Sequence, residues 1–213
     1  MAELRVYRMM LLGVLACVCW LGLSSQARAQ ASNTDRASDV DLEFRLHLLV
    51  ASNVAADAAK LPAQLEVVAR DLRPLLPFTN YRLGATFLSR AKSGKSLSVK
   101  GVGRTLLVTP ALEASVNPTF YEFSTGTISL RGDEAGREVV QLAPFRFGLR
   151  IPLQGTVSRG GDEGNGSVLY EPVGITTELT LREGEPTVVG TLDAGRPNET
   201  LVLVLIATRA GAR

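Results

Sequence analysis

The stretch Leu201-Val-Leu-Val-Leu-Ile206, close to the end of the chain, decides the fold. Successive residues of a strand point to opposite faces, so a strand without a polar residue has to be covered on both faces. Full burial of each large aliphatic side chain contributes about 1.5–3 kcal/mol. The stretch therefore predicts a strand in the middle of a sheet with packing on both sides, and its deletion should unfold the domain.

One helix is predicted upstream of this strand. Leucine and valine recur at helical spacing from Leu61 to Leu72. Pro62 suits a first helical turn, and Pro74 ends the run because its ring disfavours helical backbone at the preceding residue. The helix follows the segment 42–50, in which apolar residues alternate with polar ones, and this period of two predicts a half-buried strand.

Short alternating segments, broken by Gly, Pro or Asn, predict strands over most of the remaining chain. The last two of these segments are expected to pair as a hairpin through the turn Glu183-Gly-Glu185. The expected strands are 81–87, 96–99, 104–109, 120–123, 127–130, 139–142, 145–151, 175–181 and 187–192.

This pattern predicts an α+β fold in which β structure dominates. One helix packs on an antiparallel sheet, and a β-sandwich-like set of strands follows. We expect residues 41–110 to form a β-α-β-β-β module and residues 111–213 to form an all-β module that shares one core with the first.

The first 29 residues read as a cleaved signal peptide. Arg5 and Arg8 precede the uncharged run Met9–Leu23, and Ala27-Arg-Ala29 supplies a signal peptidase site. The run is shorter than the roughly 20 apolar residues that a spanning helix needs. We expect cleavage after Ala29, a flexible tail over 30–39, and a periplasmic or secreted protein without a stable membrane span.

A lipoprotein is the alternative reading of the same leader. Val14-Leu-Ala-Cys17 would then be a lipobox, with Cys17 acylated and the protein tethered to a membrane. The sequence disfavours this reading, because the mature chain would begin with the apolar segment 17–23 rather than with a polar linker.

Loss of the leader changes the composition. The leader holds three of the 23 basic and one of the 21 acidic residues, which leaves 20 of each. A neutral domain without a run of Lys or Arg lacks the charge that nucleic-acid binding needs, so we expect no nucleic-acid partner. Both cysteines, Cys17 and Cys19, lie in the leader, so the exported chain has neither a thiol nor a disulfide.

A single histidine, His47, limits the available enzyme chemistry. It lies on the polar face of the strand 42–50, and we expect a surface or edge histidine. A catalytic base would need a nucleophile and an orienting acid beside it, and an ordinary zinc site would need further His or Cys ligands. We therefore expect no catalytic residue, no cofactor-binding residue, no metal ligand and no enzyme activity.

Several short motifs match known chemistry without its context. Ser89-Arg-Ala-Lys92 has the Ser-x-x-Lys spacing of β-lactamases, but it falls at a strand end instead of opening a helix, and its partner motifs are absent. Gly94-Lys-Ser96 matches only the end of a P-loop, and we interpret both it and Gly101-Val-Gly103 as turns. Arg131-Gly-Asp133 spells an integrin-binding tripeptide, but three residues recur by chance and a hairpin tip explains them fully.

Acidic residues leave two possibilities open. The glycine-rich loop 159–166 contains Asp162, Glu163 and Asn165, whose oxygens could bind calcium. A mobile loop is the alternative, and a calcium-dependent rise in melting temperature would distinguish the two. A facing pair of carboxylates could also cleave a polysaccharide, although no local pattern identifies such a pair.

The C-terminal region resembles bacterial secretins. Thr177-Glu-Leu-Thr-Leu-Arg-Glu-Gly-Glu-Pro-Thr-Val-Val-Gly190, followed by the apolar strand in 199–208, is similar to the hairpin and final strand of secretin cores. The β-α-β-β order at the start is similar to the ring-building modules of secretin periplasmic arms. The resemblance implies a periplasmic protein of a type II or type III secretion or pilus system, in which such modules pack side by side.

The chain also departs from the secretin pattern. Thr191 replaces a glycine, the membrane-lip segment before the final strand is absent, and the chain is too short to form a gate. An ordinary β-hairpin beside a central strand accounts for the same residues.

These observations predict a non-enzymatic exported protein that acts by protein–protein contact. An envelope or secretion-system protein is the expected partner, and the sequence does not indicate an oligomeric state. The alternatives are a carboxylate-dependent hydrolase of cell wall or polysaccharide and a small-ligand-binding module built on the strand with Phe145 and Phe147.

Overall fold

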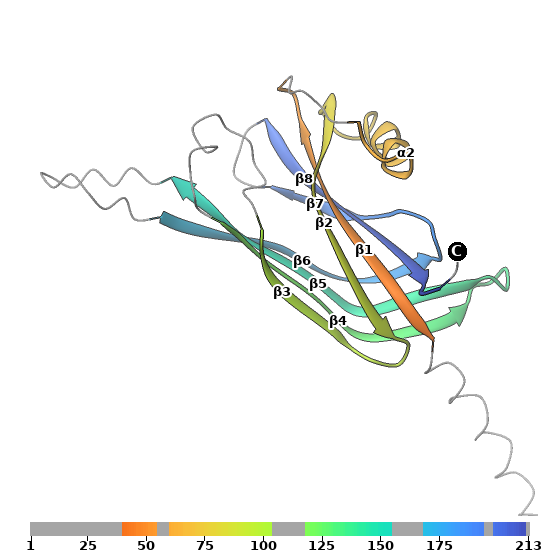
Figure 1. The fold of residues 1–213 in the computed structure, drawn as a ribbon. Coiled ribbons are helices and arrows are strands. Elements are labelled where there is room, and N and C mark those ends of the chain that lie inside the picture. The colour runs from red at the N-terminus through yellow and green to blue at the C-terminus, as the bar shows by residue number, and fades with distance from the viewer. Residues whose placement is uncertain (1–39, 55–59, 104–117, 155–167, 194–197, 212–213) are drawn as a thin grey trace, which may run out of the picture. The chain divides into compact units, whose positions relative to one another are not determined.

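A computed structural model of the protein describes residues 40–54, 60–103, 118–154, 168–193 and 198–211. These residues form two four-stranded antiparallel sheets and one helix (Figure 1). The prediction of a β-dominant α+β fold is thus confirmed. The leader 1–29, the tail 30–39, the expected strand 104–109 and the loop 159–166 lie outside the described residues.

Sheet 1 has the strand order β2-β1-β8-β7. Its strands are β1 (Asp41–Ser52), β2 (Asn80–Lys92), β7 (Thr187–Asp193) and β8 (Glu199–Arg209). The central pair, β1 and β8, joins the beginning of the described chain to its end, with Leu46 opposite Leu205. Sheet 1 therefore closes only when the last strand has been added.

Sheet 2 has the strand order β3-β4-β5-β6. Its strands follow one another along the chain as a meander: β3 (Leu97–Gly103), β4 (Thr119–Gly132), β5 (Glu138–Gln154) and β6 (Val168–Arg182). The long β4 and β5 each join two of the shorter strands that the sequence predicts. The join is possible because the register shift between Leu142 and Phe145 absorbs the irregular residues between the two segments of β5.

The two sheets pack face to face over one apolar core. Alternate residues of the central strands supply it, as the period of two predicts. Fully or almost fully buried members are Leu42, Phe44, Leu46, Leu48, Val50, Phe123, Ile128, Val140, Leu142, Phe145, Phe147, Leu149, Ile151, Leu181, Leu201, Leu203, Leu205 and Ala207.

A second apolar core lies on the other side of sheet 1, under α2 (Ala63–Leu72). The helix buries Leu65, Val68, Ala69 and Leu72, whose spacing places them on one face. Figure 1 shows α2 beside β1 and β8, on the side away from sheet 2. Val202 and Val204 pack under the helix while Leu203 and Leu205 face sheet 2, so β8 is covered on both sides, which confirms that prediction.

Two predictions about local structure are wrong. β7 pairs with β8 and not with β6, and β6 and β7 belong to different sheets. The turn at Gly184, whose φ of +77° suits glycine, therefore links the two sheets instead of closing a hairpin. Gly101 and Gly103 lie within β3 and not in a turn. Local sequence predicts a strand, but the choice of partner depends on residues far away in the chain.

The boundary expected between the modules 41–110 and 111–213 falls among residues 104–117, outside the described part of the chain. The division into two modules therefore stays a prediction.

Candidate functional site

A cluster of charged residues lies on the outer face of sheet 1, below the helix. Glu43 is only 8% exposed, although its strand position is one that the sequence assigns to the polar face. Arg45 donates to Oε1 of Glu43 from Nε at 3.0 Å and from Nη2 at 2.7 Å. Arg90 donates to Oε2 of Glu43 from Nε at 3.1 Å and from Nη2 at 2.8 Å. The hydrogen bonds from Arg90, and then those from Arg45, lower the pKa of Glu43. This carboxylate is ionised and saturated, so it serves as a structural anion and not as a base.

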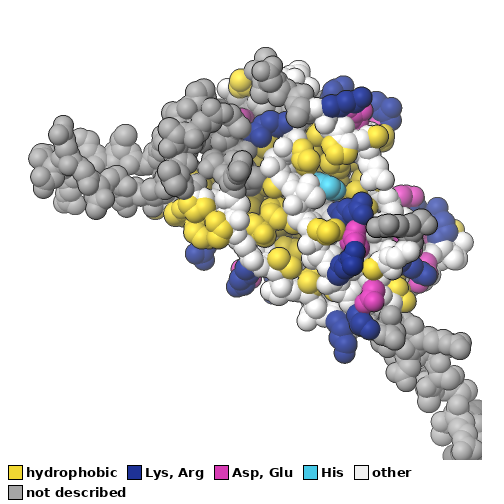
Figure 2. All heavy atoms as spheres, in the orientation of Figure 1, with side chains coloured by type: hydrophobic (Ala, Val, Ile, Leu, Met, Phe, Trp, Pro, Cys, Tyr) yellow, Lys and Arg dark blue, Asp and Glu magenta, His cyan; other side chains and the backbone are white. Residues whose placement is uncertain are grey.

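His47 lies on the same face and is buried, which corrects the expectation of a surface or edge histidine. β1 is a central strand with β2 and β8 on its two sides, so even its outward-facing side chains are crowded. Figure 2 shows this histidine beside acidic and basic side chains. Nδ1 lies 2.9 Å from Oγ1 of Thr86, and burial, followed by the charge of Arg45, lowers the pKa of His47. Within the described residues the ring of His47 makes its hydrogen bond with Thr86, and no carboxylate there orients the ring as in a catalytic triad.

The segments that match the Ser-x-x-Lys and P-loop motifs, 89–92 and 94–96, do not have the structures that those motifs require. Ser89 and Lys92 both lie on β2, and residues three apart on a strand point to opposite faces. Gly94, with a φ of +77°, lies in the turn that joins β2 to β3, and a strand follows it where a P-loop requires a helix.

The Arg131-Gly-Asp133 tripeptide lies at the tip of the β4–β5 hairpin, as expected. The Asp133 carboxylate accepts hydrogen bonds from the backbone N–H groups of Ala135 and Arg137, at 2.9 and 2.8 Å, and from Arg137 Nε at 3.0 Å. These bonds, chiefly the one from the Arg137 backbone, lower the pKa of Asp133. The carboxylate thus holds the turn together.

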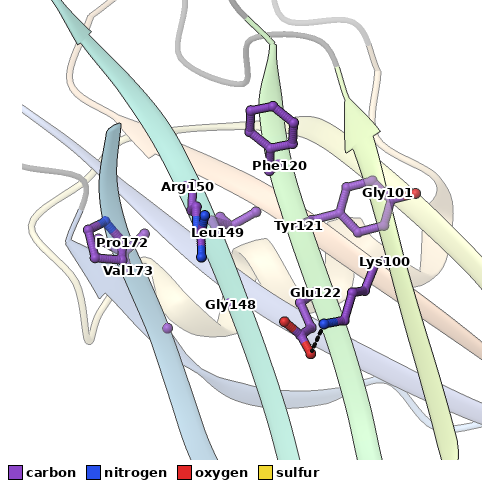
Figure 3. A pocket seen from close by; sticks show the side chains of 11 residues that line it. Lys100, Gly101, Phe120, Tyr121, Glu122, Gly148, Leu149, Arg150, Pro172 and Val173 are labelled. Carbon is purple, nitrogen blue, oxygen red and sulfur yellow. Dashed lines mark ion pairs between the residues drawn. The ribbon is translucent and has the colours of Figure 1, made fainter. Parts of the chain in front are cut away.

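Sheet 2 carries a groove of about 540 Å³ that crosses all four of its strands. Gly148 of β5 and Gly174 of β6 are directly opposite each other, so no side chain fills the space in front of them. Figure 3 shows Phe120, Glu122, Lys100, Arg150 and Pro172 around this space. The groove is lined by Lys100, Gly101, Phe120, Tyr121, Glu122, Gly148, Leu149, Arg150, Pro172, Val173 and Gly174.

The charges around the groove are not balanced. Lys100 and Glu122 form an ion pair across β3 and β4 at 3.2 Å. Arg150 lines the groove, and Arg146 lies on the same face of β5, on the other side of Gly148. Within the described ranges neither arginine has a hydrogen-bond or ion-pair partner. The groove is therefore flanked by two arginines that are available to an anion.

An apolar patch adjoins the groove at the end where Arg150 lies. Phe120 is 40% exposed and Val102, directly opposite it on β3, is 61% exposed. The ring of Phe120 contacts the ring of Tyr170 across β5, with centroids 5.4 Å apart. We call Val102, Phe120 and Tyr170 the outer patch.

The groove is not visible in the sequence pattern of its strands. Arg146, Gly148 and Arg150 alternate with the buried residues of β5, and this alternation predicts a wet face but not a hollow one. The glycine in the middle of this predicted strand is the signal that the sequence offers.

This geometry does not support the two alternative functions, a small-ligand-binding module and a carboxylate-dependent hydrolase. Phe145 and Phe147 are buried in the core between the sheets and do not line the groove. Glu122 is the carboxylate that lines it within the described chain, and it is paired with Lys100. The described residues contain no cluster of three or more potential metal ligands. Calcium binding by the loop 159–166 stays a prediction, because the loop lies outside them.

In the described part of the chain, no helix combines the length and the apolar character that crossing a membrane requires.

No protein-family model and no curated protein matches the chain. Among solved structures it is similar to a chain of the Klebsiella pneumoniae type II secretion system outer membrane complex of PulD, PulS and the PulC HR domain, with 12% identity and a TM-score of 0.34 over 82% of this chain and 39% of that chain. It is also similar to the secretin domain β-barrel of InvG from the Salmonella SPI-1 injectisome, with 12% identity and a TM-score of 0.35 over 83% of this chain and 64% of that one.

A second InvG structure from the same injectisome matches with 11% identity and a TM-score of 0.27, over 83% of this chain and 66% of that one. The chain thus spans less than two thirds of the length of each of these neighbours. The resemblance to secretin domains is weak and partial, as the C-terminal sequence predicts.

Proposed function

We propose that this protein is exported and acts without catalysis, by binding another protein of the cell envelope through the outer face of sheet 2. The outer patch is the observation that carries the proposal. Val102, Phe120 and Tyr170 form a continuous apolar line across the strands, and exposed contiguous apolar surface marks interaction sites more often than isolated apolar side chains do. Aromatic residues and arginine are also enriched in protein–protein interfaces.

The polar groups elsewhere support a role without catalysis. Glu43 is saturated by two arginines, Asp133 holds its own turn, and His47 is buried against Thr86. Each of these three titratable groups is thus engaged in a structural contact. Export is supported by the signal-peptide pattern of residues 1–29.

The finer proposal is that the partner belongs to a secretion or pilus system. Its support is the similarity of the segments 177–190 and 199–208 to the final strands of secretins.

Site-specific photo-crosslinking in cells tests this function. A benzoylphenylalanine side chain in place of Phe120 should form adducts with one recurring envelope protein, because the probe lies on the outer patch. The same probe in place of Leu88, which is 61% exposed on β2 of the other sheet, is the matched control. Mass spectrometry identifies the adduct, and the interaction is then repeated with the two purified proteins.

Equal or absent crosslinking at the two positions would overturn the proposal. Turnover of a wall or polysaccharide substrate by the purified protein, abolished by one side-chain change, would overturn it as well. A recurring partner outside secretion and pilus systems would contradict the finer proposal and leave the general one standing.

A further inference from the structure

We propose that the groove of sheet 2 binds an extended peptide segment of the partner that carries two acidic side chains four residues apart and apolar side chains on the same face. This inference rests on the proposed function and names the chemistry of its binding surface. The segment lies along β5, over Gly148, with its acidic side chains on Arg146 and Arg150 and an apolar side chain on the outer patch.

The glycine at position 148 is the first observation. Glycine inside a strand costs about 0.5–1 kcal/mol relative to alanine, so its presence calls for a reason. Packing within the chain explains the glycine at 174, because a Cβ there would lie 2.6 Å from the carbonyl oxygen of Phe147. Packing does not explain Gly148, directly opposite, since a Cβ there would have no atom within 4 Å. Glycine inside a strand often marks a bulge, a tight bend or the close approach of a ligand or another backbone, and the pairing of β5 has no register shift at Gly148, which favours the last of these.

The two arginines are the second observation. Arg146 and Arg150 follow each other on one face of β5 with Gly148 between them, and neither has a partner within the described residues. Four residues along a strand span about 13 Å, which is also the separation of side chains four residues apart in an extended peptide. Guanidinium groups bind carboxylates in a planar, two-pronged geometry, so two carboxylates at this spacing fit the pair.

The walls of the groove are the third observation. Phe120 and Glu122 rise from β4 on one side of Gly148, and Pro172 rises from β6 on the other. Lys100 neutralises Glu122, so this carboxylate does not repel an acidic segment as strongly as a free one would. Phe120 lies opposite Arg150 on the neighbouring strand, so an apolar side chain two residues from the acidic one, and therefore on the same face of the segment, reaches the aromatic rings of the outer patch.

Peptide binding to the purified full chain tests the inference. The probe is a fluorescein-labelled peptide, Ser-Glu-Thr-Val-Thr-Glu-Thr-Phe, whose two glutamates are four residues apart and whose apolar residues share their face, and the control probe has lysine in place of both glutamates. Fluorescence anisotropy should show saturable binding of the acidic peptide alone, weakened by salt. Arg150→Gln and Arg146→Gln should each weaken binding about tenfold, because each removes a charge-assisted contact. Arg70→Gln, on the exposed side of α2, should leave it unchanged.

Gly148→Val is the decisive variant. The Cβ that it adds would point into the groove with no atom within 4 Å, so binding should be lost while the melting temperature is maintained. Failure of the acidic peptide to saturate at about 1 mM, equal binding of the two peptides, or full binding by Gly148→Val would each overturn the inference.

The two proposals fail in different ways. Crosslinking at position 120 without binding of the acidic peptide means that the partner uses the outer patch but not the arginines. Binding of the acidic peptide without a crosslinked partner means that the groove has the stated chemistry but the proposed function is wrong.

Discussion

The outer faces of the two sheets differ in how completely other parts of the protein cover them. On sheet 1, α2 covers β1 and β8 at one end, and the arginines that clamp Glu43 cover the face below it. On sheet 2, two glycines lie side by side, two arginines have no partner among the described residues, and Phe120 is 40% exposed. The first face contributes to the stability of the fold, whereas the second is left open at a cost in stability. This difference makes the outer face of sheet 2 the candidate functional surface.

The largest expected effect concerns the strand that both cores share. Leu203 is fully buried on β8, so Leu203→Ala should lower the free energy of unfolding by about 2–5 kcal/mol. Leu169→Ala on β6, where the side chain is 61% exposed, should change it by less than about 0.5 kcal/mol. Urea denaturation measures both. Similar losses at the two positions would show that β8 is not the central strand.

The two glycines of the groove provide the next test. Gly174→Val should destabilise the protein by about 1–3 kcal/mol, because the new Cβ would crowd the Phe147 carbonyl oxygen. Gly148→Val should leave stability unchanged or raise it by up to about 1 kcal/mol, because its Cβ has open space and valine favours strands. Thermal unfolding of the two variants compares them directly. A large loss for Gly148→Val would mean that packing explains this glycine and that the face is not held open for a ligand.

Two glutamates compare the closed face with the open one. Glu43→Gln should lower the melting temperature clearly, because one amide cannot accept the four hydrogen bonds that Arg45 and Arg90 donate. Glu122→Gln should have little effect, since the side chains of Lys100 and Glu122 are 69% and 53% exposed and such pairs contribute about 0–1 kcal/mol. Equal shifts in melting temperature would remove the distinction between the faces.

The smallest effect is a dependence of stability on pH at His47. Burial lowers the pKa of this histidine from its ordinary value of 6.5, so below that pH the unfolded chain binds more protons than the folded one. The contribution is complete above pH 6.5 and is lost as the pH falls through the lowered pKa. His47→Gln should therefore flatten the stability profile between about pH 7 and pH 5. Glu43 acts in a separate window, below its ordinary pKa of 4.5, and provides the internal control. An unchanged slope in His47→Gln would show that the ring is not buried as a neutral group.

Much of the fold can be predicted from local pattern. The apolar run 201–206 predicts a strand covered on both sides, and the period of two predicts the inward residues of β1 and β5. The same patterns do not identify strand partners, which is why β7 was expected beside β6. They also do not identify crowding around a polar residue, which is why His47 was expected at the surface.

The groove shows this limit most clearly. Arg146, Gly148 and Arg150 predict only a solvated face, and the hollow exists because the register of β5 and β6 places Gly148 directly opposite Gly174. Register is a relation between two strands, so neither strand sequence contains it alone.

Within the described residues, the amino-acid sequence by itself determined the cores of most strands, where the helix lies, and that β8 must be buried on both faces. These properties follow from the alternation of apolar and polar residues within one segment. Only the tertiary structure decided which strands are neighbours, which arginines find a carboxylate, and which pair of glycines meets to form a groove. Those outcomes depend on side chains from distant segments that come within a few ångströms of one another only after the sheets have formed.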